Sequence, residues 1–330
     1  MSAKFKALIV KEENGKFIRE ITDRSIDDLP PGDILINVQY SSLNYKDALS
    51  AAGNKGVTRR YPHTPGIDAA GVVVDTKSSK FTEGDEVLVT GYDLGMNTSG
   101  GFAEFIRVPA EWVVKIPDRL FIKESMILGT AGLTAGLALD RMEENGLDKE
   151  GEVLVTGASG GVGSMATAIL AKQGYKVVAG TGKTNQENYL KEIGAISLIS
   201  RDEMIDKSRK ALLSGRWSGV VDNVGGEILS TAIASTKQWG VVAACGNAAS
   251  VELNTTVFPF ILRGISLLGI NSEKTPIELR EKMWEKLANE WKPQNLRVMY
   301  EECSLEETNK KIEEILQGKI KGRVLVNVQK

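Results

Sequence analysis

The chain has 330 residues, which suggests two domains at the usual ~100–200 residues per domain. Its 41 lysines and arginines against 43 aspartates and glutamates leave a net charge of −2, which disfavours a nucleic-acid partner because phosphate-coating proteins carry a basic excess. With one histidine (His63) and two cysteines (Cys245 and Cys303), neither a four-cysteine zinc site nor one of two cysteines and two histidines can be built.

The amino-terminal segment is polar and does not look like a targeting signal. Residues 1–6 run into only four apolar residues, 7–10, far short of a signal-peptide core. No stretch approaches the ~18–20 apolar residues that cross a bilayer, and two thiols fit a reducing compartment. We therefore expect a cytoplasmic protein with no membrane partner.

Short strands are expected throughout the first third of the chain. Residues 6–10 and 16–21 flank Asn14-Gly15, a pair typical of a tight hairpin because both residues tolerate positive φ. Residues 33–40 alternate apolar and polar side chains, as a half-buried strand does. Further strands are expected at residues 71–75, 86–90, 102–108 and 112–116. This number and spacing of strands indicates a small barrel or sandwich.

After Pro117 the pattern changes to alternating helices and strands. Residues 123–142 are long enough for a helix. Gly129, Gly132 and Gly136 mark a stretch of it that is broken or closely packed. Strands are expected at residues 152–156, 176–179, 195–199, 219–222, 241–244 and 266–270, and the tail adds helices near 276–290 and 305–316 and a strand at 324–328. The alternation predicts an α/β fold, a doubly wound parallel sheet with helices on both faces.

The most informative segment is a glycine-rich turn. The sequence Gly157-Ala158-Ser159-Gly160-Gly161-Val162-Gly163 follows a buried strand and leads into a helical run at residues 164–172. Glycines allow a sharp turn and the close approach of a pyrophosphate, and the free N–H groups of the helix face the anion. The strand before, the helix after and the further strands favour a dinucleotide site over an ordinary strand–helix turn.

The end of the next strand indicates which dinucleotide binds. An NAD site places an acidic residue about 20 residues past the first glycine, where it bonds the ribose 2′-hydroxyl. Here the strand ends in Thr181-Gly182-Lys183, and no carboxylate occurs before Glu187. Lys183 can instead meet a 2′-phosphate, with Thr181 donating a hydrogen bond, so the sequence predicts NADP(H). The alternative is that Lys183 is a solvated surface lysine.

Five segments spread along the chain carry a family resemblance. They are residues 41–49 (SSLNYKDAL), 65–71 (PGIDAAG), 129–135 (GTAGLTA), the turn at 157–163 and residues 258–264 (FPFILRG). Together they resemble the medium-chain dehydrogenase/reductase superfamily in its zinc-free quinone-oxidoreductase branch, and within it the bacterial group that includes acrylyl-CoA reductase. The resemblance implies a discontinuous GroES-like β-barrel catalytic domain, residues 1–128 and 272–330, and an inserted Rossmann NADP-binding domain, residues 129–271.

The resemblance also implies the site residues. Tyr45 should lie beside the nicotinamide, and Thr130 should approach its amide. The pyrophosphate should be held by Ser159, Gly160, Gly161 and Val162, the ribose phosphate by Thr181, Gly182, Lys183 and Arg201, and the nicotinamide pocket should include Asn247, Ile270 and Ser272. The segments that hold catalytic zinc in alcohol dehydrogenases correspond to residues 44–46 and 66–68, so no metal site is expected.

A nicotinamide enzyme without a metal suits an acceptor that spreads negative charge by conjugation: a quinone, an enone or an enoyl-CoA. Tyr45 is the first candidate to donate to the oxygen that develops charge, with Asn44 as an orienting group. The alternative for Tyr45 is a packed aromatic in the barrel wall. Arg263 could pair with a coenzyme A phosphate or merely cap a surface. An NADPH-binding protein with a structural or sensing role and little turnover is the competing function.

The strand at residues 266–270 is expected at an edge of the parallel sheet. An unpaired edge invites association with a second copy, and relatives pair this edge across a two-fold axis. We therefore expect a homodimer that uses this strand.

Overall fold

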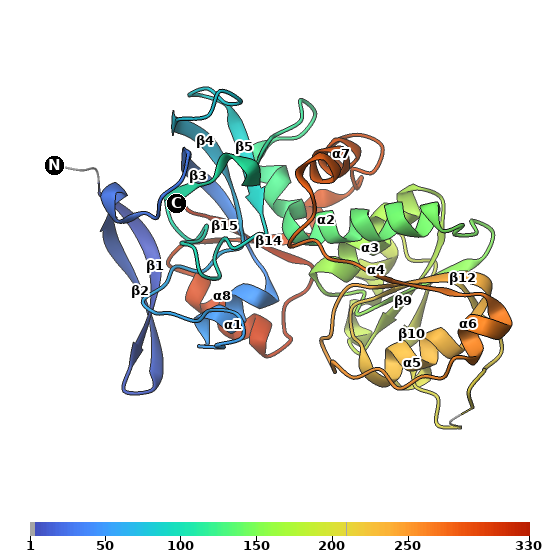
Figure 1. The fold of residues 1–330 in the computed structure, drawn as a ribbon. Coiled ribbons are helices and arrows are strands. Elements are labelled where there is room, and N and C mark those ends of the chain that lie inside the picture. The colour runs from blue at the N-terminus through green and yellow to red at the C-terminus, as the bar shows by residue number, and fades with distance from the viewer. Residues whose placement is uncertain (1–3, 209) are drawn as a thin grey trace. The chain divides into compact units, whose positions relative to one another are not determined.

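The structure is a computed structural model, and it describes residues 4–208 and 210–330 (Figure 1). The chain divides into two compact units. Unit 1 comprises Met1–Thr130, Ser272–Ala288 and Tyr300–Lys330, and unit 2 comprises Ala131–Asn271 and Asn289–Met299. The expected domain limits differ from this division at residues 129–130 and in the segment 289–299, which groups with unit 2.

Unit 1 begins with the expected hairpin. Strands β1 (Lys4–Glu13) and β2 (Lys16–Ser25) pair antiparallel over their whole length. Asn14 and Gly15 have φ values of 51° and 76°, so the turn has the left-handed backbone that the Asn-Gly pair predicts.

A seven-stranded sheet forms the rest of the β structure of unit 1. Its strands are β3 (Ile34–Leu43), β4 (Asp68–Thr76), β5 (Glu86–Thr90), β6 (Phe105–Val108), β7 (Val113–Lys115), β14 (Tyr300–Ser304) and β15 (Arg323–Asn327). The order is β14-β15-β3-β4-β5-β7, with β6 paired to β3. Because Val324 pairs with Leu43, the carboxy-terminal strand lies beside the end of β3.

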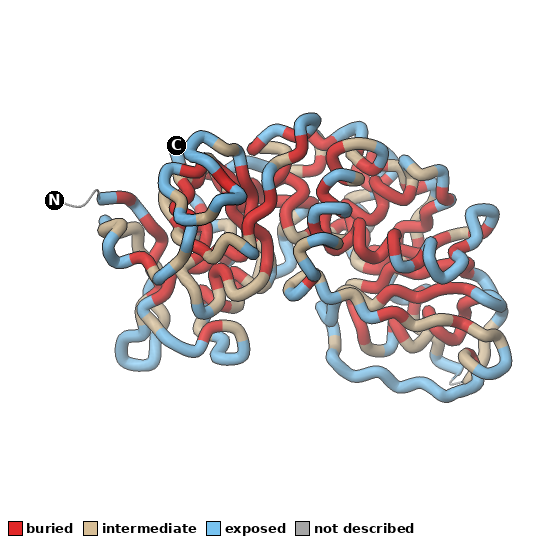
Figure 2. Tube along the Cα trace, turned by 45° about the horizontal axis from the view of Figure 1, so that its top comes forward, coloured by how far each residue is buried: buried red, intermediate tan, exposed pale blue. Residues whose placement is uncertain are grey.

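This sheet is accompanied by α1 (Tyr45–Ala51), α7 (Ile277–Ala288) and α8 (Thr308–Leu316). The sequence analysis expected α7 and α8 but neither α1 nor β14. One cluster of buried apolar residues in unit 1 is shared by strands and α8, and it includes Leu8, Ile36, Val89, Ile312 and Val326. Figure 2 shows how buried and exposed residues alternate along the chain.

Unit 2 contains a six-stranded, fully parallel sheet of order β10-β9-β8-β11-β12-β13. The strands are β8 (Glu152–Thr156), β9 (Lys176–Thr181), β10 (Ser197–Ser200), β11 (Trp217–Asp222), β12 (Thr236–Ala244) and β13 (Ser266–Gly269), and the helices are α3 (Gly161–Lys172), α4 (Glu187–Glu192), α5 (Gly226–Ala234) and α6 (Phe258–Arg263). This confirms the expected doubly wound fold. The chain winds outward from β8 in both directions, so the strand order reverses between β8 and β11, the point at which such sheets bind ligands.

Helix α2 (Ile122–Glu144) is broken at Gly129, which has φ 51° and ψ −155°. This break lies where the sequence analysis placed the first interrupting glycine. Among the described residues, none of the helices has both the length and the apolar character required to cross a bilayer.

Candidate active site

The glycine-rich turn connects β8 to α3 in unit 2. Gly157 has φ 59°, a conformation in which a side chain is strained. A Cβ at Gly163 would collide with the carbonyl oxygen of Gly157, so this helix can approach the turn only with glycine there. In the described part of the chain, no side chain caps the first N–H groups of α3, which begins after Gly160. The turn therefore presents backbone donors to an anion.

Polar residues meet at the carboxyl ends of β8 and β11, where the strand order reverses. The Thr156 hydroxyl donates to Asp222 (2.6 Å), and the Asn223 amide nitrogen donates to the Thr156 carbonyl (2.8 Å). Asp222 is fully buried, and burial raises the pKa of its carboxyl group. The side-chain oxygen of Asn223 is buried without a hydrogen-bond partner among the described residues, and a donor group of a bound ligand would satisfy it.

The residues predicted to bind the ribose phosphate lie together after β9. The Ser159 and Thr181 hydroxyls are 3.2 Å apart, and the backbone N–H of Lys183 donates to the Thr181 hydroxyl (3.0 Å). A Cβ at Gly182 would lie 3.3 Å from Nε of Arg201, so the guanidinium group flanks this turn. Lys183 is partly buried, and burial lowers the pKa of its ammonium group. Two cations therefore border the turn that follows the strand.

The other residues predicted for unit 2 are more scattered. Val162 lies in the first turn of α3 and is partly exposed. Asn247 is exposed after β12, and the N–H of Ile270 donates to the carbonyl of Ala244 at the end of that strand (3.0 Å). These positions keep Asn247 and Ile270 near the carboxyl end of the sheet, and their contact with a nicotinamide stays a prediction.

In unit 1, Asn44 and Asp47 set the start of α1. The Asp47 carboxylate accepts hydrogen bonds from the backbone N–H groups of Asn44 (2.7 Å), Ile67 (2.8 Å) and Gly66 (3.2 Å). Asp47 is fully buried, and burial, helped by the charge of nearby Asp68, raises its pKa to about 7. Asp47 thus ties the 66–67 turn to the helix that begins at Tyr45.

Asp68 is the centre of a buried polar network. Its carboxylate accepts hydrogen bonds from the Ser42 hydroxyl (2.6 Å), the Asn44 amide (2.8 Å) and both the backbone N–H (3.0 Å) and the hydroxyl (2.5 Å) of Thr130. Arg323 lies 3.7 Å away as its ion-pair partner. Asp68 and Arg323 are 0% and 3% exposed, so this pair is shielded from water.

Arg323 extends the network to three separate segments. Its guanidinium donates to the Asn44 side-chain oxygen (3.1 Å) and to the Ile127 carbonyl (3.1 Å). A Cβ at Gly129 would lie 2.6 Å from the Asp68 carboxylate, which explains why this kink requires glycine. The side-chain nitrogen of Asn44 donates to Asp68 and its oxygen accepts from Arg323. Because Asn44 is fixed in this way, it holds its neighbour Tyr45 in position. The sequence analysis did not identify Arg323, because only the pairing of β15 with β3 reveals its partners.

Tyr45 is the first residue of α1, and the residue is 51% exposed. The structure therefore disagrees with the alternative in which this ring packs in the barrel wall. Thr130 and Ser272, also predicted near the nicotinamide, belong to unit 1. Thr130 is bound to Asp68 as described above, and Ser272 accepts a hydrogen bond from Arg280 through its carbonyl (3.0 Å).

The residues present do not fit a zinc ion. Within the described ranges, no group of three or more histidine, cysteine, aspartate or glutamate side chains could hold a metal. Asp68, at one of the positions that correspond to zinc ligands in alcohol dehydrogenases, is already saturated by its four hydrogen bonds. The backbone of the one histidine, His63, pairs with Val10, and burial lowers the pKa of its imidazole.

Two family models match the chain. The alcohol dehydrogenase GroES-like domain matches residues 30–118, and the zinc-binding dehydrogenase family matches residues 161–289. The first match agrees with the expected GroES-like domain. The name of the second refers to zinc ligands that the donor set described above does not supply.

Relatives cover nearly the full length of the chain. YhfP of Bacillus subtilis, classed by name with the quinone oxidoreductases, is 44% identical over 330 residues, 99% of this chain and 100% of its own. Acrylyl-CoA reductase AcuI of Ruegeria pomeroyi is 41% identical over 327 residues, 98% of this chain and 99% of its own.

Solved structures of relatives have the same fold. The crystal structure of YhfP with NAD bound has a TM-score of 0.97 at 44% identity and covers 99% of this chain and 100% of its own. The yhdH oxidoreductase from Salmonella enterica in complex with NADP has a TM-score of 0.95 at 40% identity and covers 98% and 99%.

Proposed function

Because the chain belongs to the medium-chain dehydrogenase/reductase superfamily, in its quinone oxidoreductase branch, we propose that it is an NADPH-dependent oxidoreductase that reduces conjugated acceptors. The observation that carries this function is the glycine turn at the strand-order reversal of unit 2, bordered by Thr181, Lys183 and Arg201. When bound, NADPH supplies hydride. The chain's residues bind the cofactor and stabilise the acceptor.

Cofactor binding follows from the charges around the turn. The N–H groups at the start of α3 bind the pyrophosphate, while Lys183 and Arg201 bind the 2′-phosphate. The turn after β9 offers no carboxylate at residues 181–186 to bond a free 2′-hydroxyl, so the phosphorylated cofactor is preferred. Asn223 offers its unpartnered oxygen to a donor group of the cofactor.

Acceptor chemistry is assigned to unit 1. Hydride addition to a quinone, an enone or an enoyl-CoA places negative charge on an oxygen, and a fixed hydrogen-bond donor there lowers the barrier. Tyr45 supplies that donor, and Asn44 positions it through its bonds to Asp68 and Arg323. Thr130, Asn247, Ile270 and Ser272 are proposed to contact the nicotinamide.

The test is a turnover assay on two acceptors. Purified protein is mixed with NADPH or NADH and with either 1,4-benzoquinone or acrylyl-CoA, and the loss of reduced-cofactor absorbance is followed. We expect turnover with NADPH on at least one acceptor, weaker turnover with NADH, and no loss of activity after treatment with a chelator. Strong thermal stabilisation by NADPH without turnover on either acceptor would instead identify a binding protein.

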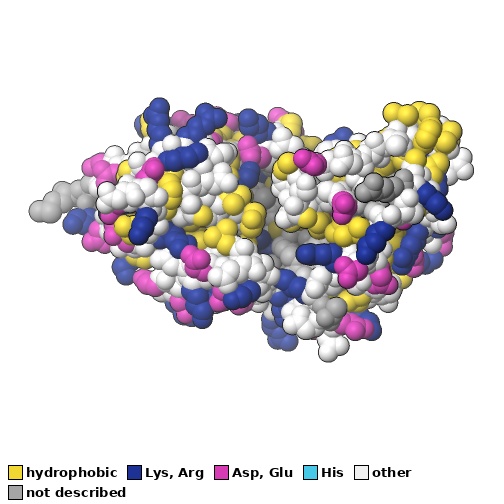
Figure 3. Space-filling view, turned by 90° about the horizontal axis from the view of Figure 1, so that it is seen from below, with side chains coloured by type: hydrophobic (Ala, Val, Ile, Leu, Met, Phe, Trp, Pro, Cys, Tyr) yellow, Lys and Arg dark blue, Asp and Glu magenta, His cyan; other side chains and the backbone are white. Residues whose placement is uncertain are grey.

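We also propose that the chain is a homodimer in the cytoplasm, formed through the free edge of β13. Strand β13 ends the six-stranded sheet, and apolar side chains gather over the neighbouring α6 (Figure 3). Trp239 is 71% exposed and Ile261 is 68% exposed. A patch of large apolar side chains exposed to water is typical of a surface that binds another protein. Light scattering should give twice the 35.8 kDa of one chain, and Ile261→Glu should halve that mass.

A further inference from the structure

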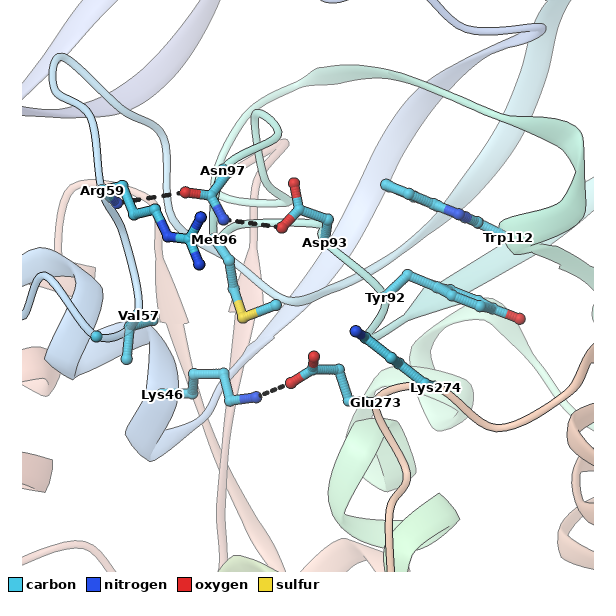
Figure 4. A pocket seen from close by; sticks show the side chains of 11 residues that line it. Lys46, Val57, Arg59, Tyr92, Asp93, Met96, Asn97, Trp112, Glu273 and Lys274 are labelled. Carbon is cyan, nitrogen blue, oxygen red and sulfur yellow. Dashed lines mark hydrogen bonds and ion pairs between the residues drawn. The ribbon is translucent and has the colours of Figure 1, made fainter.

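A cavity of about 470 Å³ lies within unit 1 (Figure 4). Its charged lining residues are Lys46, Arg59, Asp93, Glu273 and Lys274. Lys46 directly follows Tyr45 in α1, so the cavity begins one residue from the proposed donor to the acceptor. None of the residues of the Asp68 network lines it.

The two acidic groups of this cavity are satisfied from within the protein. Glu273 forms an ion pair with Lys46 at 2.5 Å. Asp93 accepts a hydrogen bond on one carboxylate oxygen from Asn97 (3.0 Å) and on the other from Thr98 (3.0 Å). With three cations against two anions, the lining has a net positive charge.

Arg59 is the cation with capacity to bind a ligand. Its backbone N–H donates to the side chain of Asn97 (3.3 Å). Arg59 is exposed, and its guanidinium makes no hydrogen bond or ion pair to any residue that the structure describes. Figure 4 shows the guanidinium of Arg59 and the ammonium group of Lys274 extending from opposite sides toward the cavity. A planar guanidinium suits a phosphate group because it donates two parallel hydrogen bonds.

The wall opposite Arg59 is held rigidly. Tyr92 stacks on Trp112, with ring centres 5.5 Å apart and planes 5° apart, and the guanidinium of Arg280 lies 4.4 Å from the Tyr92 ring centre. Arg280 is fully buried and donates to the carbonyls of Thr90 (2.6 Å) and Glu273 (3.2 Å). The stretches that carry Asp93, Glu273 and Lys274 are thus fixed before a ligand arrives, which lowers the entropic cost of binding.

We propose that this cavity binds the phosphate-bearing end of an acyl-coenzyme A and that Arg59 is the residue that binds the phosphate. This inference rests on the proposed function, and it makes an enoyl-CoA the acceptor that the chain selects, since a neutral quinone has no group that uses this cation. Arg263, the other arginine considered for this role, donates to the carbonyls of Ala234 and Thr236 and to that of Leu213. Its guanidinium is therefore committed to the backbone.

The experiment compares Arg59→Ala with Arg60→Ala, a neighbouring exposed arginine that does not line the cavity. KM is measured for acrylyl-CoA and for 1,4-benzoquinone at saturating NADPH. Arg59→Ala should raise KM for acrylyl-CoA about tenfold or more, as expected for loss of its charge-assisted hydrogen bonds to the phosphate, and leave KM for benzoquinone unchanged. Arg60→Ala should change neither. Equal effects of both variants, or an equal effect of Arg59→Ala on both acceptors, overturn the assignment.

A binding measurement separates this inference from the proposed reaction. Coenzyme A and inorganic phosphate are titrated calorimetrically into protein saturated with NADP⁺, so that the cofactor site is closed to coenzyme A. Coenzyme A should bind, and Arg59→Ala should weaken it about tenfold. If coenzyme A binds in this Arg59-dependent way but acrylyl-CoA is not turned over, the binding site is supported and the proposed reaction is refuted. Turnover without dependence on Arg59, or phosphate binding as tightly as coenzyme A, would refute the site.

Discussion

The ion pair between Asp68 and Arg323 offers a quantitative test of how unit 1 is held together. Arg323→Met keeps the length of the aliphatic stem and removes the charge. Breaking one partner of a buried pair costs about 3–5 kcal/mol, because the remaining charge is left uncompensated. Here the Asp68 carboxylate keeps four hydrogen bonds from Ser42, Asn44 and Thr130. We therefore expect the lower end of that range, about 3 kcal/mol.

Hydrogen–deuterium exchange measures this loss locally, which matters because a chain of two units need not unfold in one step. Amides in the ladder between β15 and β3 exchange when this part of unit 1 opens. A loss of about 3 kcal/mol accelerates their exchange about 100-fold, at about 1.4 kcal/mol per tenfold.

The matched control is Glu306→Gln, which removes an exposed ion pair of unit 1, with Lys6 at 3.5 Å. Surface pairs contribute about 0–1 kcal/mol, so this variant should leave exchange in β3 and β15 almost unchanged. If Arg323→Met accelerates exchange no more than this control does, the buried network does not hold β15 to β3 and the reasoning fails.

Three further predictions concern the proposed site and its supports. Tyr45→Phe should lower kcat about 100-fold with little change in NADPH affinity by calorimetry; an unchanged kcat removes Tyr45 as the donor. Lys183→Ala should weaken NADPH about 10- to 100-fold and leave NADH unaffected, whereas equal losses would contradict a 2′-phosphate role. The pKa of Asp47 is raised from 3.8 to about 7 in the folded state, so the folded protein binds its proton more tightly. As the pH rises from about 4 to about 7, the urea midpoint should therefore decrease, and above that range it should level off. Asp47→Asn should make that decrease smaller, and an unchanged decrease would contradict the role of Asp47.

The sequence alone predicted those parts of the structure that depend on residues close together in the chain. Asn14-Gly15 predicts its own hairpin, and the strand, glycine turn and helix at residues 152–172 predict a dinucleotide fold, because turn geometry and helix termini are local properties. Helix α1 could also have been found: Asn44 and Asp47 have the spacing of a reciprocal cap. Strand β14 could not, since its residues Tyr-Glu-Glu-Cys-Ser neither alternate nor form an apolar run.

Only the tertiary structure decided which polar groups meet. Arg323 is 279 residues from Asn44, and Arg280 is 190 residues from Thr90, so no local pattern marks either arginine as buried. The cavity around Arg59 likewise collects side chains from five separate stretches of unit 1. A buried charge is stable only where distant segments bring donors and acceptors to it, and strand pairing, which the sequence leaves open, determines where those segments come together.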